Sequence, residues 1–250
     1  MGDLEMDFYR SISAYYDRIF PTDQKALAFL HSRAQPGSRI LDIACGTGGY
    51  SIALAERGHR VTGIDLDRAM IRSARSKARD LERAPDFRVM NMLSLAEALD
   101  PGFDLLFCIG NSLVHLETDE QIGRFLGDCR TLLGAKGVLV VQIINYDRIL
   151  AQGLTGLPTL RDDAIPLEFM RIYDLDPGGK VVIFRTELRV GRGADQRVIR
   201  NQIPLRIVTS GQLTQLVSAA GFRGLELFGG FDGRSFGSEC LPLILSARRD

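Results

Sequence analysis

The sequence has no excess of charge of either sign: its 250 residues include 31 Lys and Arg and 31 Asp and Glu. A protein without a basic field does not attract nucleic acid or anionic lipid non-specifically, so neither is an expected partner. Also missing is any apolar stretch near the roughly 20 residues that cross a bilayer, and there are no internal repeats or low-complexity tracts. What remains is the profile of a globular protein with one hydrophobic core, or one core and an appendage.

Signatures of disulfides, metal sites and export are missing as well. The four cysteines, at positions 45, 108, 129 and 240, show no CxxC spacing, which favours reduced thiols over a disulfide framework or a zinc site. The acids Asp104 and Asp147 are too scattered to form a metal cluster, so no metal is expected. The opening segment, MGDLEMDFYR, has no basic region followed by an apolar run. Without that leader pattern, a cytoplasmic location is expected.

Short aliphatic runs alternate with amphipathic segments from Arg39 onward. Strands are predicted at 39–45, 59–65, 86–92, 102–110, 137–145, 223–231 and 241–248, and helices at 48–58, 67–84, 118–137 and 210–222. Aliphatic strands that are each followed by a helix are typical of a parallel sheet covered on both faces. The predicted fold is therefore α/β: a Rossmann-like, doubly wound, mostly parallel seven-stranded sheet that binds its ligand at the carboxyl ends of the strands.

A different pattern fills the region between the fifth strand and the last helix. Residues 165–175, 180–190 and 196–208 alternate polar and apolar side chains, and the turn sequences DPGG and GRGAD join them. Such alternation predicts an antiparallel meander, which leaves the main sheet at its ligand edge and is expected to form a lid. The predicted organisation is a helical cap and ligand-binding core at 1–146, an inserted β lid at 147–209, and core elements again at 210–250.

The stretch RILDIACGTGGY, residues 39–50, carries the most specific signal. A phosphate-binding P-loop needs Lys and then Ser or Thr after its glycines, but a glycine and a tyrosine follow Gly48. A dinucleotide fingerprint needs a third glycine where Ser51 stands, so that match is only partial. The remaining pattern is an acid followed by small residues and then G-x-G, and DIACGTG fits it from Asp42 to Gly48.

Two acids indicate the kind of ligand. Asp42 ends its strand beside the glycine turn, where it would repel a diphosphate but suits a cation such as the amino group of an amino acid. Asp65 ends the next strand, and its carboxylate can accept hydrogen bonds from both hydroxyls of a ribose. A ligand with a ribose and a positive group, and with no phosphate, has the composition of S-adenosylmethionine.

The segment LDIACGTGGYSIALAERGHRVTGIDLDRAM resembles the first two motifs of class I S-adenosylmethionine-dependent methyltransferases. CIGNSLVHL and INYDRIL resemble the glycine N-methyltransferase group and its bacterial relatives that act on small molecules, and the likeness runs from about Tyr16 to Arg249. It implies S-adenosyl-L-methionine as cofactor, with an apolar residue at Met70 against the adenine. The predicted cofactor-binding residues are Tyr9, Asp42, Cys45, Gly46, Thr47, Gly48, Asp65, Leu66, Met70, Asn91, Met92, Leu93, Cys108, Ile109 and Gly110.

The catalytic residues are expected after the fourth strand and near the N-terminus. In-line methyl transfer needs an aligned nucleophile and a pocket without water. Asn111 can offer a carbonyl oxygen to a positive centre, and His115 is either a general base or a packed histidine. Tyr16, like Tyr9, is expected to close over the sulfonium with its oxygen or its ring face.

Three further residues are predicted to bind the substrate. Asn145 matches an asparagine that touches the amino-acid substrate in the glycine-methylating relatives, and Tyr146 follows it; the alternative for Asn145 is a hydrogen bond to backbone at the strand's end. Arg171 lies within an apolar and aromatic strand face, which is costly unless the guanidinium meets an anion. That anion is either a substrate carboxylate or a local acid such as Asp162 or Asp163.

The expected function is methylation of a small-molecule acceptor, most simply the nitrogen of an amine or of an amino acid such as glycine or sarcosine. Three alternatives stay open from the sequence. They are O-methylation of a small molecule, an NAD-dependent oxidoreductase, and a non-catalytic S-adenosylmethionine-binding protein. Asp42 and the missing third glycine count against the oxidoreductase.

Overall fold

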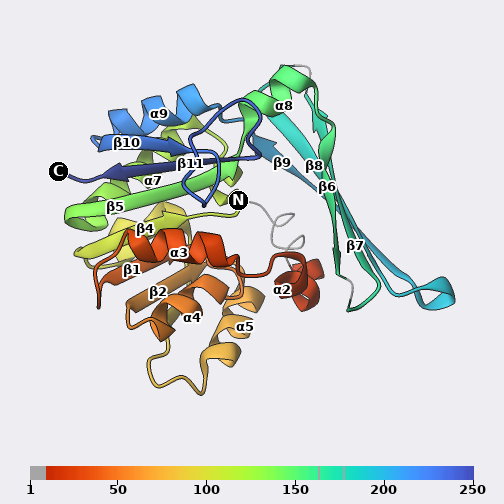
Figure 1. The fold of residues 1–250 in the computed structure, drawn as a ribbon, viewed down its shortest axis with the longest axis horizontal. Helices are drawn as coiled ribbons and strands as arrows, with labels where there is room; N and C mark the ends of the chain where they lie inside the picture. Colours follow the sequence, from red (N-terminus) through yellow and green to blue (C-terminus); the bar gives the residue numbers. More distant parts are fainter. Residues whose placement is uncertain (1–9, 163, 177) are drawn as a thin grey trace.

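The computed structural model describes residues 10–162, 164–176 and 178–250. Its centre is a seven-stranded sheet with the order β10-β11-β5-β4-β1-β2-β3 (Figure 1). The strands are β1 (Arg39–Ile43), β2 (Arg60–Asp65), β3 (Asp86–Val89), β4 (Phe103–Cys108), β5 (Leu133–Ile144), β10 (Arg223–Phe228) and β11 (Pro242–Arg248). Strands β1 to β5 pair in parallel and β11 runs antiparallel to both its neighbours. The predicted Rossmann-like α/β sheet is confirmed.

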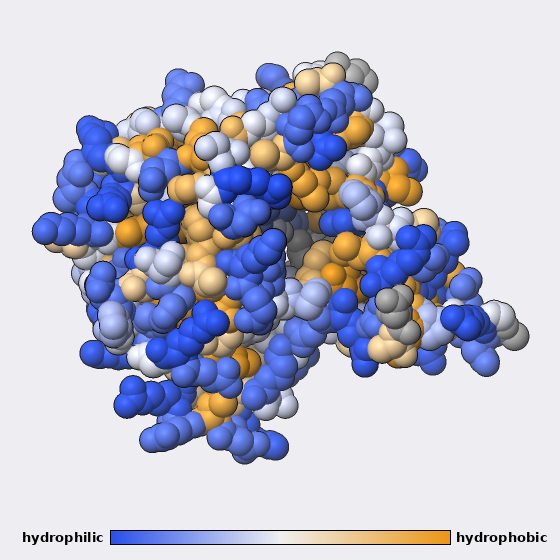
Figure 2. Space-filling view, viewed as in Figure 1, coloured by the Kyte–Doolittle hydropathy of each residue, from blue (hydrophilic) through white to orange (hydrophobic). Residues whose placement is uncertain are grey.

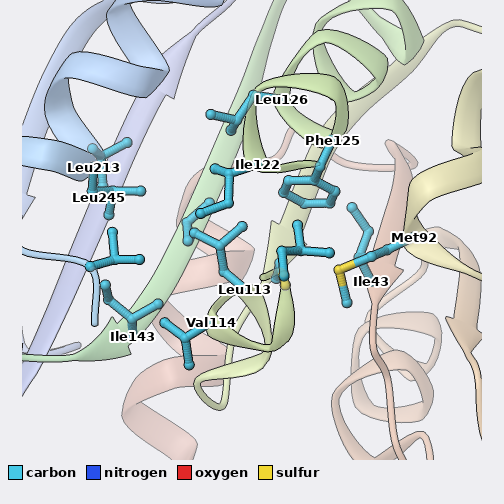
Figure 3. Close-up of a cluster of buried hydrophobic side chains, with 14 of the residues drawn as sticks. Ile43, Met92, Leu113, Val114, Ile122, Phe125, Leu126, Ile143, Leu213 and Leu245 are labelled. Atoms are coloured by element: carbon cyan, nitrogen blue, oxygen red, sulfur yellow. The ribbon is translucent and has the colours of Figure 1, made fainter. Parts of the chain in front are cut away.

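Helices cover both faces of this sheet because successive strand residues point to opposite sides. On one face Ile40, Phe107 and Val140 pack with α3 (Gln24–Ser32) and α4 (Gly49–Glu56). On the other face Leu41, Leu106 and Val141 pack with α7 (Asp119–Leu132) and α9 (Ser210–Ala219). Figure 3 shows this second cluster, with Phe125, Leu126 and Ile122 of α7 and Leu213 of α9 directed at the strands. Such two-sided burial is what makes the strands almost wholly aliphatic.

The boundary between α7 and β5 differs from the sequence prediction. Thr118 caps α7 as expected, its side chain accepting a hydrogen bond from the backbone N–H of Gln121. The helix ends at Leu132, however, and β5 begins at Leu133, whereas the helical pattern of the sequence extends to Gly137. Leu133 pairs with Phe103 of β4, so sheet pairing takes over before the helical periodicity ends.

A second, four-stranded antiparallel sheet projects from the core after α8 (Tyr146–Gln152) (Figure 1). Its strands, in spatial order, are β6 (Gly156–Asp162), β7 (Leu167–Leu175), β8 (Val181–Val190) and β9 (Arg197–Arg206). We call it the β6–β9 sheet. The predicted meander is present, with β6 as an additional strand. Figure 2 shows hydrophobic side chains gathered around the hollow between this sheet and the core.

The N-terminal helix α2 (Tyr16–Ile19) lies between the core and the β6–β9 sheet (Figure 1). Arg18 of α2 forms an ion pair with Asp162 of β6 at 2.8 Å. Asp17 of α2 accepts hydrogen bonds from Thr47 of the core and, at 2.8 Å, from Lys77 of α5 (Arg68–Ala78). This short helix therefore forms polar contacts with both the core and the β6–β9 sheet. Within the ranges described, no helix is both long and apolar enough to pass through a bilayer.

Candidate active site

A cavity of about 460 Å³ opens at the carboxyl ends of β1, β2, β4 and β5. Residues of α2 and of the β6–β9 sheet form its opposite wall. This is the edge at which doubly wound sheets bind ligands. Its volume is typical of sites for small organic molecules.

Two glycines of the turn after β1 are required for different reasons. Gly46 has φ +55° and lines the cavity, and a Cβ there would lie 3.1 Å from the ring of Tyr16. Gly48 has φ +79°, and a Cβ there would lie 2.5 Å from Phe87 Cζ and 2.9 Å from Ala74 Cβ. Gly46 thus keeps space at the cavity floor, whereas Gly48 allows the turn to pack against β3 and α5.

Two carboxylates lie beside this turn, Asp42 buried and Asp65 half-buried. Asp42 is 3% exposed and accepts a hydrogen bond of 2.6 Å from Ser51 Oγ. Asp65 accepts hydrogen bonds of 2.8 Å from the backbone N–H groups of Gly46 and Asp67. Burial is the main cause that raises the pKa of Asp42 to about 7 and that of Asp65 to about 6, and the negative charge of Asp65 raises the pKa of Asp42 further. A cation placed beside them would stabilise both charges.

The charges of the cavity are divided between its two ends. Asp17, Asp42, Asp65 and Asp67 line the end near the glycine turn, and Arg171 lines the opposite wall. An anionic group such as a diphosphate would be repelled at the acidic end, where a sulfonium or an ammonium is favoured. The acidic end therefore favours a ligand group that carries a positive charge.

The loop after β4 is held rigidly at the cavity. The backbone N–H of Gly110 donates to Gln142 Oε1 at 2.7 Å. Asn111 has φ +71°, its Oδ1 accepts from the backbone N–H of Ile144 at 2.9 Å, and its Nδ2 donates to the hydroxyl of Tyr146 at 3.3 Å. These hydrogen bonds tie the end of β4 to the end of β5, so the loop backbone is preorganised.

A family model described as a methyltransferase domain matches residues 40–137, which contain both acids and the glycine turn. The human glycine N-methyltransferase is 34% identical over 128 residues, which are 46% of this chain and 43% of that enzyme. A glycine/sarcosine N-methyltransferase of Parasynechococcus marenigrum is 26% identical over 238 residues, 91% of this chain and 79% of that enzyme. The crystal structure of an S-adenosylmethionine-dependent methyltransferase from Clostridium acetobutylicum superposes with a TM-score of 0.79 at 17% identity, covering 96% of this chain and 98% of that one.

Residues 40–137 match a methyltransferase domain, and the chain is similar in sequence to glycine/sarcosine N-methyltransferases and in fold to an S-adenosylmethionine-dependent methyltransferase. The acid-and-glycine motif lies within the matched domain. The chain spans less than half the length of the human enzyme that it matches, 43%, so the likeness does not carry that enzyme's acceptor to this chain.

Most of the residues predicted to contact S-adenosylmethionine are brought together by the methyltransferase fold. Those that line the cavity are Asp42, Cys45, Gly46, Thr47, Asp65, Leu66, Met70, Met92, Ile109 and Gly110. The three residues predicted to be catalytic, Asn111, His115 and Tyr16, line it too. Tyr16 lies over Gly46, and burial raises the pKa of its phenol, so the hydroxyl stays protonated and can donate a hydrogen bond. Tyr9 lies outside the described residues.

Four residues predicted to contact the cofactor are not at the cavity surface. Gly48 packs against Phe87. Asn91 caps the turn Met92–Ser94, its Oδ1 accepting from the backbone N–H of Leu93 at 2.9 Å. Leu93 packs on the core, and Cys108 is fully buried there, which raises the pKa of its thiol to about 12. For these residues the structure gives a packing or capping role.

The two substrate residues predicted after β5 are not at the cavity surface either. Asn145 is 1% exposed, and its Nδ2 donates to the carbonyls of Gly237 and Cys240 at 3.2 and 2.9 Å. Its Oδ1 accepts from the backbone N–H of Arg148. The side chain of Asn145 therefore forms hydrogen bonds with backbone groups at the end of β5, as in the alternative interpretation from the sequence. Tyr146 is fully buried, and its hydroxyl accepts a hydrogen bond from Nδ2 of Asn111.

Sequence reasoning missed residues that complete the site. Gln142 orients Gly110 and lines the cavity, and its signal was a single amide in an otherwise aliphatic strand. Asp17 and Tyr50 line the cavity as well. Tyr50 accepts a hydrogen bond from the backbone N–H of Asp23 at 3.1 Å. No local sequence pattern predicts this contact.

Replacing Asp42 should affect stability and cofactor binding in opposite directions. Its folded-state pKa, about 7, lies above the ordinary value of 3.8, so the carboxylate destabilises the fold increasingly as the pH rises between these values and fully above about pH 7. Asp42→Asn keeps an acceptor for Ser51 and is expected to stabilise the ligand-free protein by about 2 kcal/mol near pH 8, as measured by thermal unfolding. We expect binding of S-adenosylmethionine, measured by calorimetry, to weaken about tenfold. Equal stabilities of the two proteins near pH 8 would contradict the assignment of a buried charge.

Proposed function

We propose that this methyltransferase transfers the methyl group of S-adenosylmethionine to the nitrogen of a small-molecule amine or amino acid. The observation that carries the proposal is the division of charge in the cavity, with Asp42 and Asp65 at one end and Arg171 in the apolar wall opposite. A zwitterionic acceptor suits that wall, since its carboxylate can reach the guanidinium while its amine faces the cofactor end. The names of the glycine N-methyltransferase and glycine/sarcosine N-methyltransferase relatives support the same interpretation.

When bound, S-adenosylmethionine supplies a methyl group on a positively charged sulfur. The acceptor would have to present its nitrogen to that methyl group as the free amine, so an ammonium substrate has to lose a proton in the cavity. Asp42 and Asp65 would hold the polar groups of the cofactor. The hydrogen bonds that tie Gly110 and Asn111 to β5 would keep the adjoining cavity surface in place. Tyr16 and α2 cover the site and exclude water. Alignment and desolvation of this kind are the main demands of the reaction.

His115 is the side chain that we assign to accept the proton of an ammonium substrate. It is 8% exposed and lines the cavity beyond Asn111. A neutral imidazole has one ring nitrogen that can accept a proton. We assign Asp42 and Asp65 to the cofactor and His115, in the same lining, to the acceptor.

The direct test is release of S-adenosylhomocysteine during incubation with a panel of amines, amino acids, phenols and carboxylic acids. We expect turnover with amines and none with compounds that offer only oxygen. Turnover restricted to the phenols or acids would replace the proposal with O-methylation. Tight binding of S-adenosylhomocysteine without turnover of any acceptor would make the chain a binding protein.

Arg171→Met should separate the role of the charge from that of the side chain's apolar stem. Methionine keeps most of the stem's contacts with the wall but offers a carboxylate no partner. We expect KM for amino-acid acceptors to rise about 30-fold, the usual effect of losing one charge-assisted pair, with little change for neutral amines. Initial-rate kinetics with both acceptor types measure this, and equal effects on the two would remove the anion-binding role.

A further inference from the structure

The acceptor side of the cavity is mainly apolar and aromatic. Leu157 and Leu160 of β6, Tyr173 of β7, Phe184 of β8 and Leu205 of β9 all line it. Pairing of the strands brings them together, since Tyr173 lies opposite Phe184, with ring centroids 5.5 Å apart. These residues form one continuous wall that we call the lid wall. It faces the cofactor end across the cavity.

Two polar side chains, Arg171 and Thr186, lie on neighbouring strands of this sheet, and of the two Arg171 lines the cavity. Arg171 is opposite Leu157 on one neighbouring strand and opposite Thr186 on the other. Its Nη2 donates to the carbonyl of Pro158 at 2.7 Å, but its buried Nε has no hydrogen-bond partner in the described part of the chain. Thr186 is 3% exposed and its Oγ1 also lacks a partner among the described residues. Buried polar groups normally have partners, so we take the guanidinium of Arg171, which lines the cavity, as the group available to a ligand.

Of the two local acids predicted as rival partners for Arg171, Asp162 is otherwise engaged and Asp163 lies outside the described residues. Asp162 forms an ion pair with Arg18 of α2. Burial lowers the pKa of the Arg171 guanidinium, and an anion in the cavity would offset that cost. A carboxylate can accept charge-assisted hydrogen bonds from a guanidinium.

We infer that the acceptor is an amino acid with an apolar side chain, a proposal that rests on the N-methyltransferase function above. Its carboxylate lies at Arg171, and its side chain lies against Leu157, Leu160 and Phe184. Glycine would leave the lid wall without a contact, whereas an aliphatic or aromatic side chain buries itself there. An amino sugar would place hydroxyl groups against the same wall without hydrogen-bond partners, which a site penalises strongly.

The substrate class is tested by comparing kcat/KM for glycine, leucine, phenylalanine, glucosamine and 2-phenylethylamine, with S-adenosylhomocysteine release as the readout. We expect leucine and phenylalanine to exceed glycine and glucosamine by about 100-fold, and 2-phenylethylamine, which lacks the carboxylate, to fall below phenylalanine. If glycine or glucosamine equals the apolar amino acids, this inference is overturned while N-methylation stands. If none of the five amines is methylated, the proposed function itself fails.

Leu157→Asn tests the lid wall, with Ile172→Asn as its matched control. Leu157 lines the cavity, whereas Ile172 lies on the same sheet with its side chain 38% exposed. Leu157→Asn should lower kcat/KM for leucine and phenylalanine about tenfold and change that for glycine less than about twofold, and Ile172→Asn should change neither. Thermal unfolding checks that both variants fold, and Leu157→Ala replaces Leu157→Asn if that variant does not. Equal effects of the two substitutions on leucine would contradict the assigned wall.

Discussion

Asp65→Asn is expected to weaken binding of S-adenosylmethionine about 100-fold, the largest effect on cofactor affinity that we predict. In the folded protein the carboxylate of Asp65 is 2.8 Å from two backbone N–H donors, those of Gly46 and Asp67. Its remaining lone pairs face the cavity, where we place the ribose hydroxyls. The amide of asparagine replaces one acceptor with a donor, so it loses a ribose hydrogen bond and also repels a backbone N–H.

Isothermal titration calorimetry measures this change, with Asp104→Asn as control. Asp104 lies at the amino end of β4, at the far edge of the sheet from the cavity, and accepts a hydrogen bond from the backbone N–H of Arg39 at 2.8 Å. That variant loses the same charge but should keep wild-type affinity. Unchanged affinity of the Asp65→Asn protein would refute the ribose assignment.

Gly48→Ala is expected to lower the free energy of unfolding by about 2–4 kcal/mol, the largest effect on stability that we predict. Part of that cost is the left-handed backbone, at φ +79°, which an L-residue adopts only with strain. The other part is the contact of the new methyl group with Phe87, 2.5 Å from where its Cβ would lie. Phe87 is 3% exposed and has little space to move.

Two companion variants separate the backbone cost from the packing cost of Gly48→Ala. Gly58 has φ +89°, and a Cβ added there would meet no heavy atom of another segment within 4 Å, so Gly58→Ala should cost only the backbone strain, about 1 kcal/mol. Adding Phe87→Leu to Gly48→Ala should recover part of the loss by opening space. Urea unfolding measures all three proteins, and equal costs at positions 48 and 58 would exclude the contact with Phe87.

The fold was predictable from the sequence because its signals repeat locally. Aliphatic runs such as those ending at Asp42 and Asp65 mark strands buried on both faces, and Thr118 marks the start of a helix. The error at the end of α7 shows the limit of such prediction. A helical pattern continued past Leu132, but pairing of Leu133 with β4 decided the outcome, because a buried backbone must satisfy its hydrogen bonds.

The site was predictable only in part. Roles that depend on residues close in the sequence were predictable, whereas roles that depend on distant residues were not. Asp65 and Gly46 belong to turns whose chemistry lies within a few residues, and both line the cavity. Asn145 has an equally suggestive position, yet its amide is occupied by carbonyls of Gly237 and Cys240, over ninety positions away in the chain. Whether a polar side chain is available to a ligand depends on such distant partners.

Local sequence patterns were enough to predict the α/β fold and the acid-and-glycine motif, because periodicity and turn chemistry act between near neighbours. Which glycine of the turn after β1 lines the cavity, the hydrogen bond from Gly110 to Gln142, and the position of Arg171 in an apolar wall beside Thr186 depended on the folded arrangement. These features depend on strands and helices meeting in space, where burial and unpaired hydrogen-bonding groups, which no local pattern records, set what a side chain can do.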